Sequence, residues 1–400
     1  MRRGRIFLDA ALLILAVAGA TPDARAQTFS VLYRFTPRPN AHTPSATLTL
    51  DAAGDIYGTT PVGGTRDSGT VFRLDASNQF SILYSFGSGG NHPYAPVRLD
   101  ANGNLYGTDT LGGRYHSGVA FKLNSAGKLT VLHAFGQGTD GAIPSGAFVE
   151  GPAGEVYGTT LHGGTDTACQ RGGLGCGTVF QLKGRTETVL YNFTAGADGE
   201  YPQGLVRDSA GNLYGASSMG VFKLDSTGKL TTIYQTGWDV SQLLLDATGN
   251  LYGTTFIGGG GACDSVQGGG CGTVFKLDTD YQKTVLYSFK GYPTDGDGPM
   301  GGLIQDAAGN IYGTTEFGGS YSCPTTSGLS GCGTVFKLDP SGQETVLHAF
   351  TGGADGSSPV SGLAMDAQGV LYGTTTTGGT LGCGSHGHDF GCGVVFKITP

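Results

Sequence analysis

Charged side chains are scarce in this chain: Asp, Glu, Lys and Arg make up 14% of its 400 residues, about half the usual share. The net charge is −8, so we expect no nucleic-acid partner, because nucleic acids bind to basic surfaces. Beyond the N-terminus there is no long apolar run, so we expect no membrane span in the mature chain. The 3.6-residue apolar period of amphipathic helices is also missing. Glycine, with 74 residues, is abundant but has no Gly-X-Y period, and 38% hydrophobic residues supply a core, which excludes a collagen and a disordered chain.

The N-terminus has the layout of a secretory signal peptide. Three arginines occur among the first five residues, an apolar stretch follows at 10–20, and Ala24-Arg25-Ala26 forms a cleavage site. The apolar stretch is about half as long as the roughly 20 residues that cross a bilayer. We therefore expect residues 1–26 to be removed and residues 27–400 to form a single domain that is secreted, into the periplasm or outside the cell. An uncleaved N-terminal anchor is the alternative.

The rest of the chain consists of seven sequence repeats. Each contains a Tyr-Gly pair with a glycine three residues before the tyrosine, and an aspartate six residues before it in all repeats except the third, where Gly151 stands. A second segment resembles Gly-Thr-Val-Phe-Lys-Leu, and a third resembles Val-Leu-Tyr-Ser-Phe. The repeated tyrosines are Tyr57, Tyr106, Tyr157, Tyr214, Tyr252, Tyr312 and Tyr372. The phenylalanines of the second segment are Phe72, Phe121, Phe180, Phe222, Phe275, Phe336 and Phe396.

Each repeat predicts four short strands, because its runs of Val, Leu, Tyr, Phe and Thr are bounded by turn residues. The Asp-x-x-Gly segment between the first two runs suits a tight hairpin, since aspartate accepts hydrogen bonds from the backbone ahead of it and glycine adopts a positive φ. Repeated four-stranded units of this length are typical of propeller blades. We predict an all-β fold, a seven-bladed β-propeller of four-stranded antiparallel blades. A β-solenoid is the alternative, although its rungs would be shorter and would lack the two hairpin turns.

The two ends of the chain predict how the ring closes. The mature sequence begins with a segment of the fourth-strand type at 30–35 and ends with one of the third-strand type at 393–398. The last blade therefore lacks an outer strand unless the N-terminal strand completes it. Such pairing closes the ring non-covalently and covers an exposed sheet edge.

These segments resemble a known family, the bacterial secreted proteins with tandem Gloeo/Verruco (GloVer) repeats, of the choice-of-anchor type. The resemblance rests on Asp-x-x-Gly-Asn-Leu-Tyr-Gly-Thr-Thr, Gly-Thr-Val-Phe-Lys-Leu-Asp and Val-Leu-Tyr-Ser-Phe, and it covers nearly all of residues 28–400. Members often end in a C-terminal sorting or anchoring segment, whereas this chain stops at Pro400, directly after its last expected strand. We therefore do not expect surface anchoring by that route. The family brings no enzymatic assignment and no catalytic residues.

The eight cysteines fall into four local pairs. They occur only in the four repeats in which 23 or 24 residues separate the repeated tyrosine from the following phenylalanine; the other three repeats have 15, 15 and 8. In an exported protein this pattern predicts four loop-closing disulfides. The pairs are Cys169/Cys176, Cys263/Cys271, Cys323/Cys332 and Cys383/Cys392. Metal binding is the alternative, but a pair supplies only half of the four ligands of a zinc site.

Loops of an up-and-down sheet alternate between its two ends, so the tight turns should share one face of the ring. The cysteine loops and the connections between blades should share the other. Long loops are where ligands usually bind, and we expect any ligand at that second face. Aromatic residues in its loops are the candidate contacts, and they are Tyr94, Tyr115, Tyr201, Trp238, Tyr292 and Tyr321.

Other polar clusters are expected to be structural. The two candidate metal clusters are His386-Gly387-His388-Asp389, in a glycine-rich loop, and Asp295-Gly296-Asp297-Gly298. The second lacks the spaced acidic ligands and distal glutamate of an EF-hand loop. His133 and His348 replace the tyrosine of the fourth strand and are expected to pack, the turn aspartates to cap their turns, and the repeated tyrosines to form core between blades. We expect neither a metal site nor a cofactor.

No catalytic motif occurs in the sequence: Gly-x-Ser-x-Gly, His-Glu-x-x-His and phosphate-cradling glycine loops are all missing. Enzymatic activity is therefore undecided. We predict a secreted, monomeric, non-catalytic repeat protein that acts as a binding or scaffold module for an extracellular glycan or protein. The alternatives are an extracellular polysaccharide-active enzyme with its site at the propeller channel mouth, and a structural component of the envelope.

Overall fold

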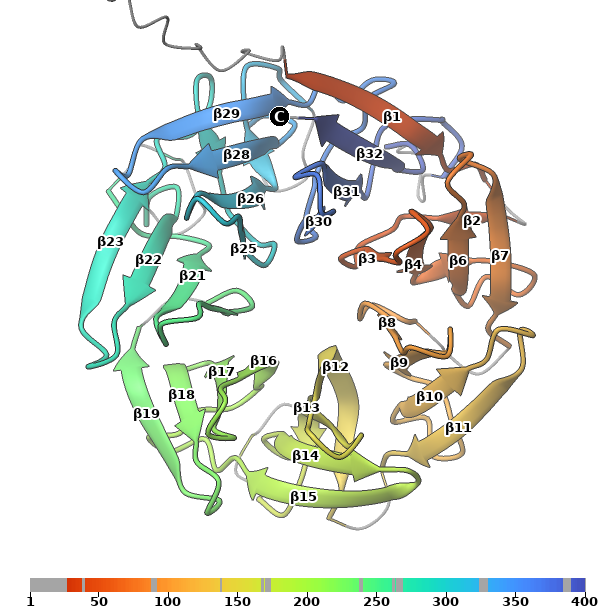
Figure 1. Ribbon diagram of the computed structural model, residues 1–400, viewed down its shortest axis with the longest axis vertical. Coiled ribbons are helices and arrows are strands. Elements are labelled where there is room, and N and C mark those ends of the chain that lie inside the picture. Colours follow the sequence, from red (N-terminus) through yellow and green to blue (C-terminus); the bar gives the residue numbers. More distant parts are fainter. Residues whose placement is uncertain are drawn as a thin grey trace, which may run out of the picture.

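The protein is a ring of seven four-stranded antiparallel sheets, as predicted (Figure 1). The structure is a computed structural model that describes residues 27–37, 40–87, 92–136, 139–166, 169, 174–236, 240–260, 263, 269–323, 330–383 and 390–399. The signal-peptide prediction, residues 1–26, lies outside this part. The described residues include no helix, and hence none that could cross a membrane.

Each blade runs from an innermost strand beside the axis to an outermost strand on the rim. Blade 1 consists of β3 (Thr49–Leu50), β4 (Ile56–Thr60), β6 (Thr70–Leu74) and β7 (Phe80–Ser85). Blade 2 consists of β8 (Arg98–Leu99), β9 (Leu105–Asp109), β10 (Val119–Leu123) and β11 (Leu129–Ala134). Blade 3 consists of β12 (Gly141–Glu150), β13 (Val156–Gly163), β14 (Thr178–Lys183) and β15 (Thr186–Asn192). Blade 4 consists of β16 (Gln203–Arg207), β17 (Leu213–Ser217), β18 (Gly220–Leu224) and β19 (Leu230–Gln235).

The remaining blades follow the same order. Blade 5 consists of β20 (Leu244–Leu245), β21 (Leu251–Thr255), β22 (Thr273–Leu277) and β23 (Lys283–Ser288). Blade 6 consists of β25 (Ile304–Gln305), β26 (Ile311–Thr315), β28 (Thr334–Leu338) and β29 (Glu344–Ala349). Blade 7 consists of β30 (Ala364–Met365), β31 (Leu371–Thr375), β32 (Val394–Thr399) and β1 (Thr28–Arg34). Two small ribbons pair β2 (Ala41–His42) with β5 (Val62–Gly63), and β24 (Gly296–Asp297) with β27 (Phe317–Gly318).

The N-terminal strand completes the last blade, which confirms the predicted closure (Figure 1). Strand β1 pairs antiparallel with β32, so that Thr28 lies opposite Thr399. Its side chains also contact both neighbouring blades: Phe29 stacks on His348 of blade 6, with ring centroids 3.7 Å apart, and Tyr33 stacks on Phe80 of blade 1 at 4.3 Å. The first strand of the chain therefore joins three blades rather than one.

Glycine in the Tyr-Gly pair is explained by packing across each sheet. Gly58 lies opposite Phe72 in the strand register, and a Cβ atom on Gly58 would stand 2.5 Å from the Phe72 ring. The same pairing recurs in every blade, for example Gly253 with Phe275. The ring of the third strand thus lies over the bare glycine of the second strand, and it is fully buried there.

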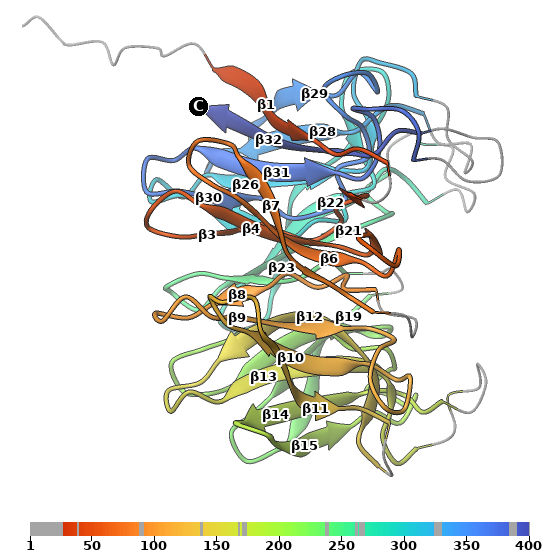
Figure 2. The same ribbon diagram turned by 90° about the vertical axis from the view of Figure 1, so that its right-hand side faces the viewer.

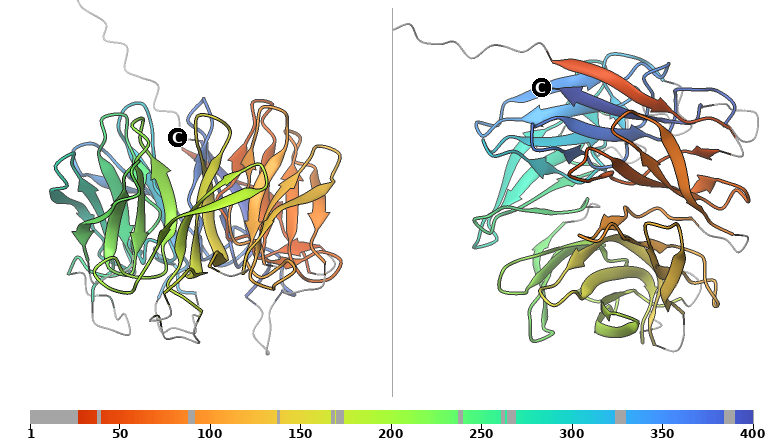
Figure 3. Two further views of the ribbon diagram at one scale, coloured as in Figure 1. Left: turned by 90° about the horizontal axis from the view of Figure 1, so that it is seen from below. Right: turned by 45° about the vertical axis from the view of Figure 1, so that its right-hand side comes forward.

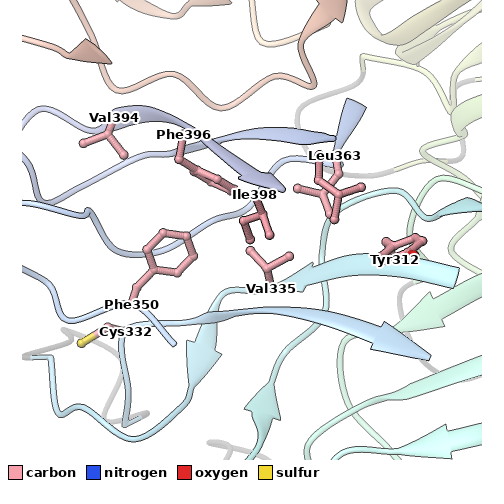
Figure 4. Close-up of a cluster of buried hydrophobic side chains, with 9 residues drawn as sticks. Tyr312, Cys332, Val335, Phe350, Leu363, Val394, Phe396 and Ile398 are labelled. Atoms are coloured by element: carbon pink, nitrogen blue, oxygen red, sulfur yellow. The ribbon is translucent and has the colours of Figure 1, made fainter. Parts of the chain in front are cut away.

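The core is divided into seven clusters, one at each junction between neighbouring blades. At the junction of blades 6 and 7, Val335 and Phe350 of blade 6 face Leu363, Phe396 and Ile398 of blade 7 (Figure 4). The repeated tyrosines lie in these layers, as predicted. Blade sheets are apolar on both faces because each is covered by a neighbour on both sides.

The tight turns hold their aspartates in the capping role that the sequence predicts. The Oδ1 atom of Asp246 accepts hydrogen bonds from the backbone N–H groups of Thr248 and Asn250, both at 2.9 Å. Its Oδ2 atom accepts the hydroxyl of Tyr252 at 3.1 Å, so the repeated tyrosine closes the same turn. Burial raises the pKa of Asp246, but the hydrogen bonds outweigh it and lower the pKa to about 2.

Blade 3 lacks the turn aspartate and replaces it from another position. A Cβ atom on Gly151 would stand 2.2 Å from Oε1 of Glu155, so the glutamate carboxylate fills the space that the aspartate occupies elsewhere. Glu155 accepts the Tyr157 hydroxyl at 3.3 Å and the backbone N–H of Ala153 at 3.1 Å. Glu155 therefore takes over the turn-capping role of the aspartate that is missing at position 151.

The ring has two unlike faces (Figures 2 and 3). The turn face carries the tight hairpins that join the first strand to the second and the third to the fourth. The loop face carries the connections between blades and the segments between the second and third strands, which lie on the right in Figure 2. Every blade except blade 4 has a long segment there; in blade 4 only Ser218 and Met219 separate β17 from β18.

Candidate ligand-binding face

The connections between blades are pinned to the preceding blade by a repeated device. In the connection to blade 4, Tyr201 adopts a left-handed φ of 57° and donates its backbone N–H to the carbonyl of Cys176 at 3.0 Å. The next residue, Pro202, lies so close to Gly177 of blade 3 that a Cβ atom there would be 2.6 Å from the proline ring. Equivalent pairs occur in four other connections, and they are Thr43-Pro44, Ile143-Pro144, Gly298-Pro299 and Ser358-Pro359.

The eight cysteines form four disulfides, each closing a loop of the loop face. The pairs are Cys169–Cys176, Cys263–Cys271, Cys323–Cys332 and Cys383–Cys392. The second cysteine of every pair is buried, and its carbonyl accepts the hydrogen bond that pins the following connection. Each disulfide therefore braces both its own loop and the start of the next blade.

His133 and His348 do more than pack. The Nε2 atom of His133 lies 2.9 Å from the carboxylate of Asp140, and that of His348 lies 3.1 Å from Asp355. Tyrosine plays the same part in other blades: the hydroxyl of Tyr191 donates to Asp198 at 3.1 Å. Burial and the Asp198 charge raise the pKa of Tyr191 to about 12. The Asp-Gly connections are thus anchored to the outer strand, a pairing that was not predicted from the sequence.

The candidate metal clusters hold no complete ligand set among the described residues. His386, His388 and Asp389 lie outside the described part of the chain. Asp295 accepts a hydrogen bond from the Tyr287 hydroxyl at 2.7 Å, so its carboxylate anchors the connection into blade 6 to strand β23. The possible metal-ligand atoms of Cys263, Cys271 and Asp297 lie within 4.8 Å of one another. The two sulfurs are joined in a disulfide, however, so they are not thiolate ligands.

An acidic pair is formed by Asp297, which is buried beside that disulfide, and Glu316, which is half-buried. Burial raises the pKa of Asp297 to about 6. Burial, together with the neighbouring Asp297, raises the pKa of Glu316 to about 7. The two residues belong to adjoining segments of the loop face, because the backbone N–H of Glu316 donates to the Gly298 carbonyl at 3.0 Å.

The structure separates the predicted aromatic contacts rather than gathering them. Tyr94, Tyr292 and Tyr321 are exposed, while Tyr115 and Tyr201 are half-buried. No ring contact joins any two of these five tyrosines in the described structure, and Trp238 lies outside it. The wider pattern is nevertheless one-sided, because seven of the nine exposed large hydrophobic side chains in the described part of the chain lie on the loop face. These seven are Tyr94, Leu174, Met219, Tyr292, Met300, Tyr321 and Leu381.

A recess of about 440 Å³ opens on the loop face above blade 4, and we call it the blade-4 recess. Its lining comes from blade 3, the connection into blade 4, the end of β17 and the connection into blade 5. The lining residues are Leu161, His162, Tyr201, Gln203, Ala216, Ser217, Ser218 and Val240. The two-residue turn after β17 leaves this volume unfilled, whereas the neighbouring blades carry long loops. The described lining contains no acidic residue, lysine or arginine.

Three polar groups of the blade-4 recess have no partner among the described residues. The Tyr201 hydroxyl and the Gln203 amide make no hydrogen bond there, and Gln203 is exposed. The Nδ1 atom of His162 is buried and unpaired. The rings of His162 and Tyr201 meet edge to face, with centroids 5.1 Å apart. Of these residues only Tyr201 was predicted from the sequence. The short segment between the second and third strands of blade 4 is the sequence feature that indicates the recess.

A second pocket, of about 790 Å³, lies beside the axis between the innermost segments of blades 1 and 2. It contains the carboxylates of Asp51 and Asp100, and also Arg98, which forms an ion pair with Glu150. Both aspartates serve their turns, each accepting two backbone N–H groups and a tyrosine hydroxyl. Burial opposes the charge of Asp100, but hydrogen bonds from Asn104 and its neighbours outweigh it and lower the pKa.

Comparison with known proteins places this fold among the propellers. The chain is similar to a streptogramin B lyase, with 12% identity, a TM-score of 0.61 and 93% of this chain and 97% of the other covered. It is also similar to an inactive virginiamycin B lyase from Staphylococcus aureus (11% identity, TM-score 0.59, 94% and 99% covered). A third similar structure is the extracellular domain of a protein assigned as a one component system from B. thetaiotaomicron, with 12% identity and a TM-score of 0.57. The match covers 94% of this chain and 42% of that one. At these identities the likeness shows the fold alone, and no curated protein matches the sequence. The Gloeobacter/Verrucomicrobia repeat matches residues 19–171 and 166–386, so the chain belongs to that repeat family.

Proposed function

We propose that the protein is an exported, non-catalytic binding module that holds an extracellular glycan or protein on its loop face. The observation that carries this proposal is that most of the exposed large hydrophobic side chains among the described residues lie on this face. Connecting loops on a rigid scaffold carry binding residues disproportionately often, and these side chains belong to such loops. The turn face, by contrast, is built of short hairpins closed by aspartate.

Export is supported by the four disulfides together with the signal-peptide pattern of residues 1–26. Disulfides persist in oxidising compartments and are rare in the cytosol. Their arrangement supports binding as well, because a braced loop loses less conformational freedom when it contacts a ligand. We expect the mature protein to act as a monomer.

The axial pocket favours binding over polysaccharide hydrolysis. Glycoside hydrolysis requires one carboxyl group with a raised pKa, which acts as the acid, near a second, ionised one. Asp51 and Asp100 are instead tied into hairpins, and the pKa of Asp100 is lowered. These two residues therefore stabilise turns rather than supply a proton.

The proposal is tested with residues 27–400 produced in the periplasm, so that the disulfides form. Plant and bacterial polysaccharides on an array identify a ligand, and release of reducing ends is measured on the same panel. We expect binding without release, and slower amide hydrogen exchange in loop-face segments upon binding. The turn-face hairpins are the internal control. Release of sugar products, or protection confined to the turn face, would contradict the proposal.

A further inference from the structure

The seven repeats allow fold requirements to be told apart from individual features within one chain. A residue that the fold needs recurs in each blade, as Gly58 and its equivalents do. The residues of the blade-4 recess do not recur. The place of His162, one residue before Gly163, is taken in blades 1 and 5 by Val62 and Ile257.

Tyr201 is equally individual. Its left-handed conformation before a proline is common to several connections, but the residue in that place is Thr43, Ile143 or Ser358 elsewhere. A tyrosine is therefore not needed to pin the connection. The buried, unpaired Nδ1 atom of His162 likewise opposes folding, because an unsatisfied buried polar group is costly.

We infer that the blade-4 recess binds an uncharged sugar unit of a glycan, an inference that rests on the proposed function. The volume of about 440 Å³ falls within the roughly 300–1,000 Å³ of small-ligand sites. It suits one or two sugar rings and is too small for a folded partner. The lack of charged residues in the described lining disfavours uronic acids, sulfated sugars and phosphates.

The chemistry of the lining matches the two sides of a sugar ring. A pyranose presents C–H groups on its faces and hydroxyl groups around its edge. Leu161, Ala216 and Val240 supply apolar surface, and the Tyr201 ring supplies an aromatic one. The Tyr201 hydroxyl and the Gln203 amide, which both donate and accept, are free to pair with the edge hydroxyls.

Two serines of the recess form hydrogen bonds with the backbone of the connection into blade 4. Ser217 donates its hydroxyl to the carbonyl of Asp198 at 2.9 Å, and the Oγ atom of Ser218 accepts the backbone N–H of Glu200 at 3.0 Å. These bonds hold the incoming connection against the short turn. The serines therefore shape the recess, while Tyr201 and Gln203 contact the sugar.

The test uses substitutions that other blades already tolerate at the same positions. His162→Val copies blade 1, and Tyr201→Thr copies the Thr43 position. The matched control is Ile143→Thr, which makes the same kind of change in the connection into blade 3, outside the recess. Thermal unfolding of each variant reports whether the fold is retained.

Binding is measured by titration calorimetry and by saturation-transfer NMR. The probes are neutral tetrasaccharides of glucose, mannose, galactose and xylose, with tetragalacturonate as the anionic probe. We expect at least one neutral probe to bind, Tyr201→Thr and His162→Val to weaken it at least tenfold, and Ile143→Thr to change it less than twofold. The fluorescence of Trp238, the single tryptophan, gives an independent signal, because Trp238 is two residues from Val240 in sequence.

Four results would overturn the inference. Tighter binding of tetragalacturonate than of neutral sugars would contradict the uncharged class. Unchanged sugar binding in both recess variants, with exchange protection elsewhere on the loop face, would refute the recess and leave the proposed function standing. A loop-face partner that proves to be a protein, with no sugar bound, would also refute the sugar assignment alone, whereas failure of all loop-face binding would refute both.

Discussion

Replacing Gly58 by alanine separates two explanations of the repeated glycine. Gly58 lies in β4 and does not have a positive φ, so alanine can adopt its backbone conformation. If backbone freedom were the only factor, alanine would stabilise the protein by about 0.4–1 kcal/mol, because it restricts the unfolded chain. The two explanations therefore predict effects of opposite sign.

Packing predicts destabilisation. The added Cβ atom would stand 2.5 Å from Cζ of Phe72 and 3.0 Å from Cδ2 of Leu48. Carbon atoms prefer separations of about 3.5–4.0 Å, so the ring would have to retreat by about 1 Å within a fully buried layer. Overpacking of this kind costs about 1–3 kcal/mol, and we expect a loss of about 2 kcal/mol.

The assay is urea unfolding followed by far-ultraviolet circular dichroism and by tryptophan fluorescence. In a Phe72→Leu background the clashing ring atoms are gone, so Gly58→Ala should become neutral or stabilising, with a coupling of about 1–3 kcal/mol. The control is Gly103→Ala, whose Cβ atom would meet nothing within 4 Å but whose φ is +75°. Its cost should be the same in both backgrounds. Stabilisation by Gly58→Ala alone, or an unchanged penalty beside leucine, would refute the packing argument.

Three further predictions concern closure, compensation and pH. A chain without residues 27–36 should have a lower melting temperature and should aggregate, because the edge of β32 is uncovered. A synthetic peptide of those residues should restore the melting temperature. Failure of the peptide to restore it would count against closure by strand pairing. The single substitutions Gly151→Asp and Glu155→Asn should each lower the melting temperature measured by calorimetry. The double variant should restore it, because it recreates the aspartate–asparagine turn of other repeats. Additive losses would show that the two positions are independent. Asp297 and Glu316 have pKa values raised to about 6 and about 7, so the folded state binds more protons than the unfolded state between about pH 4 and 7. The stability contributed by the two protonated carboxyl groups is therefore present below about pH 4 and is lost as the pH rises through 6–7. Asp297→Asn with Glu316→Gln should therefore flatten the melting profile between pH 5 and 8 and raise its value at pH 8, and an unchanged profile would contradict the cause assigned.

The fold was predictable because its causes are local and repeated. Asp246 accepts hydrogen bonds from backbone N–H groups only two and four residues ahead, and Tyr252 donates its hydroxyl to the same aspartate. The turn can therefore be predicted from a segment of seven residues. Gly253 and Phe275 belong to neighbouring strands of one blade, and so to one sequence repeat. Seven copies of each signal then give the number of blades.

The candidate site was only partly predictable. Tyr201 was identified as a loop aromatic, but nothing local distinguished it from Tyr94 or Tyr292, which are exposed and make no pair with it. His162 carries no sequence signal except its contrast with valine and isoleucine in other repeats. The partnership of His133 with Asp140 also escaped notice, because the pairing spans the end of a strand and the turn of the following connection.

The amino-acid sequence alone determined the strands, the hairpins, the seven blades, the pairing of cysteines that lie seven to nine residues apart, and the closure by the first strand. Each follows from contacts within one repeat or from the incomplete repeat that the chain ends leave. The tertiary structure decided where a ligand could sit. His162 comes from blade 3, Tyr201 from the connection into blade 4 and Val240 from the connection into blade 5, nearly 80 residues of chain in all. They line one recess because the ring places these segments side by side around the space that the short turn of blade 4 leaves unfilled.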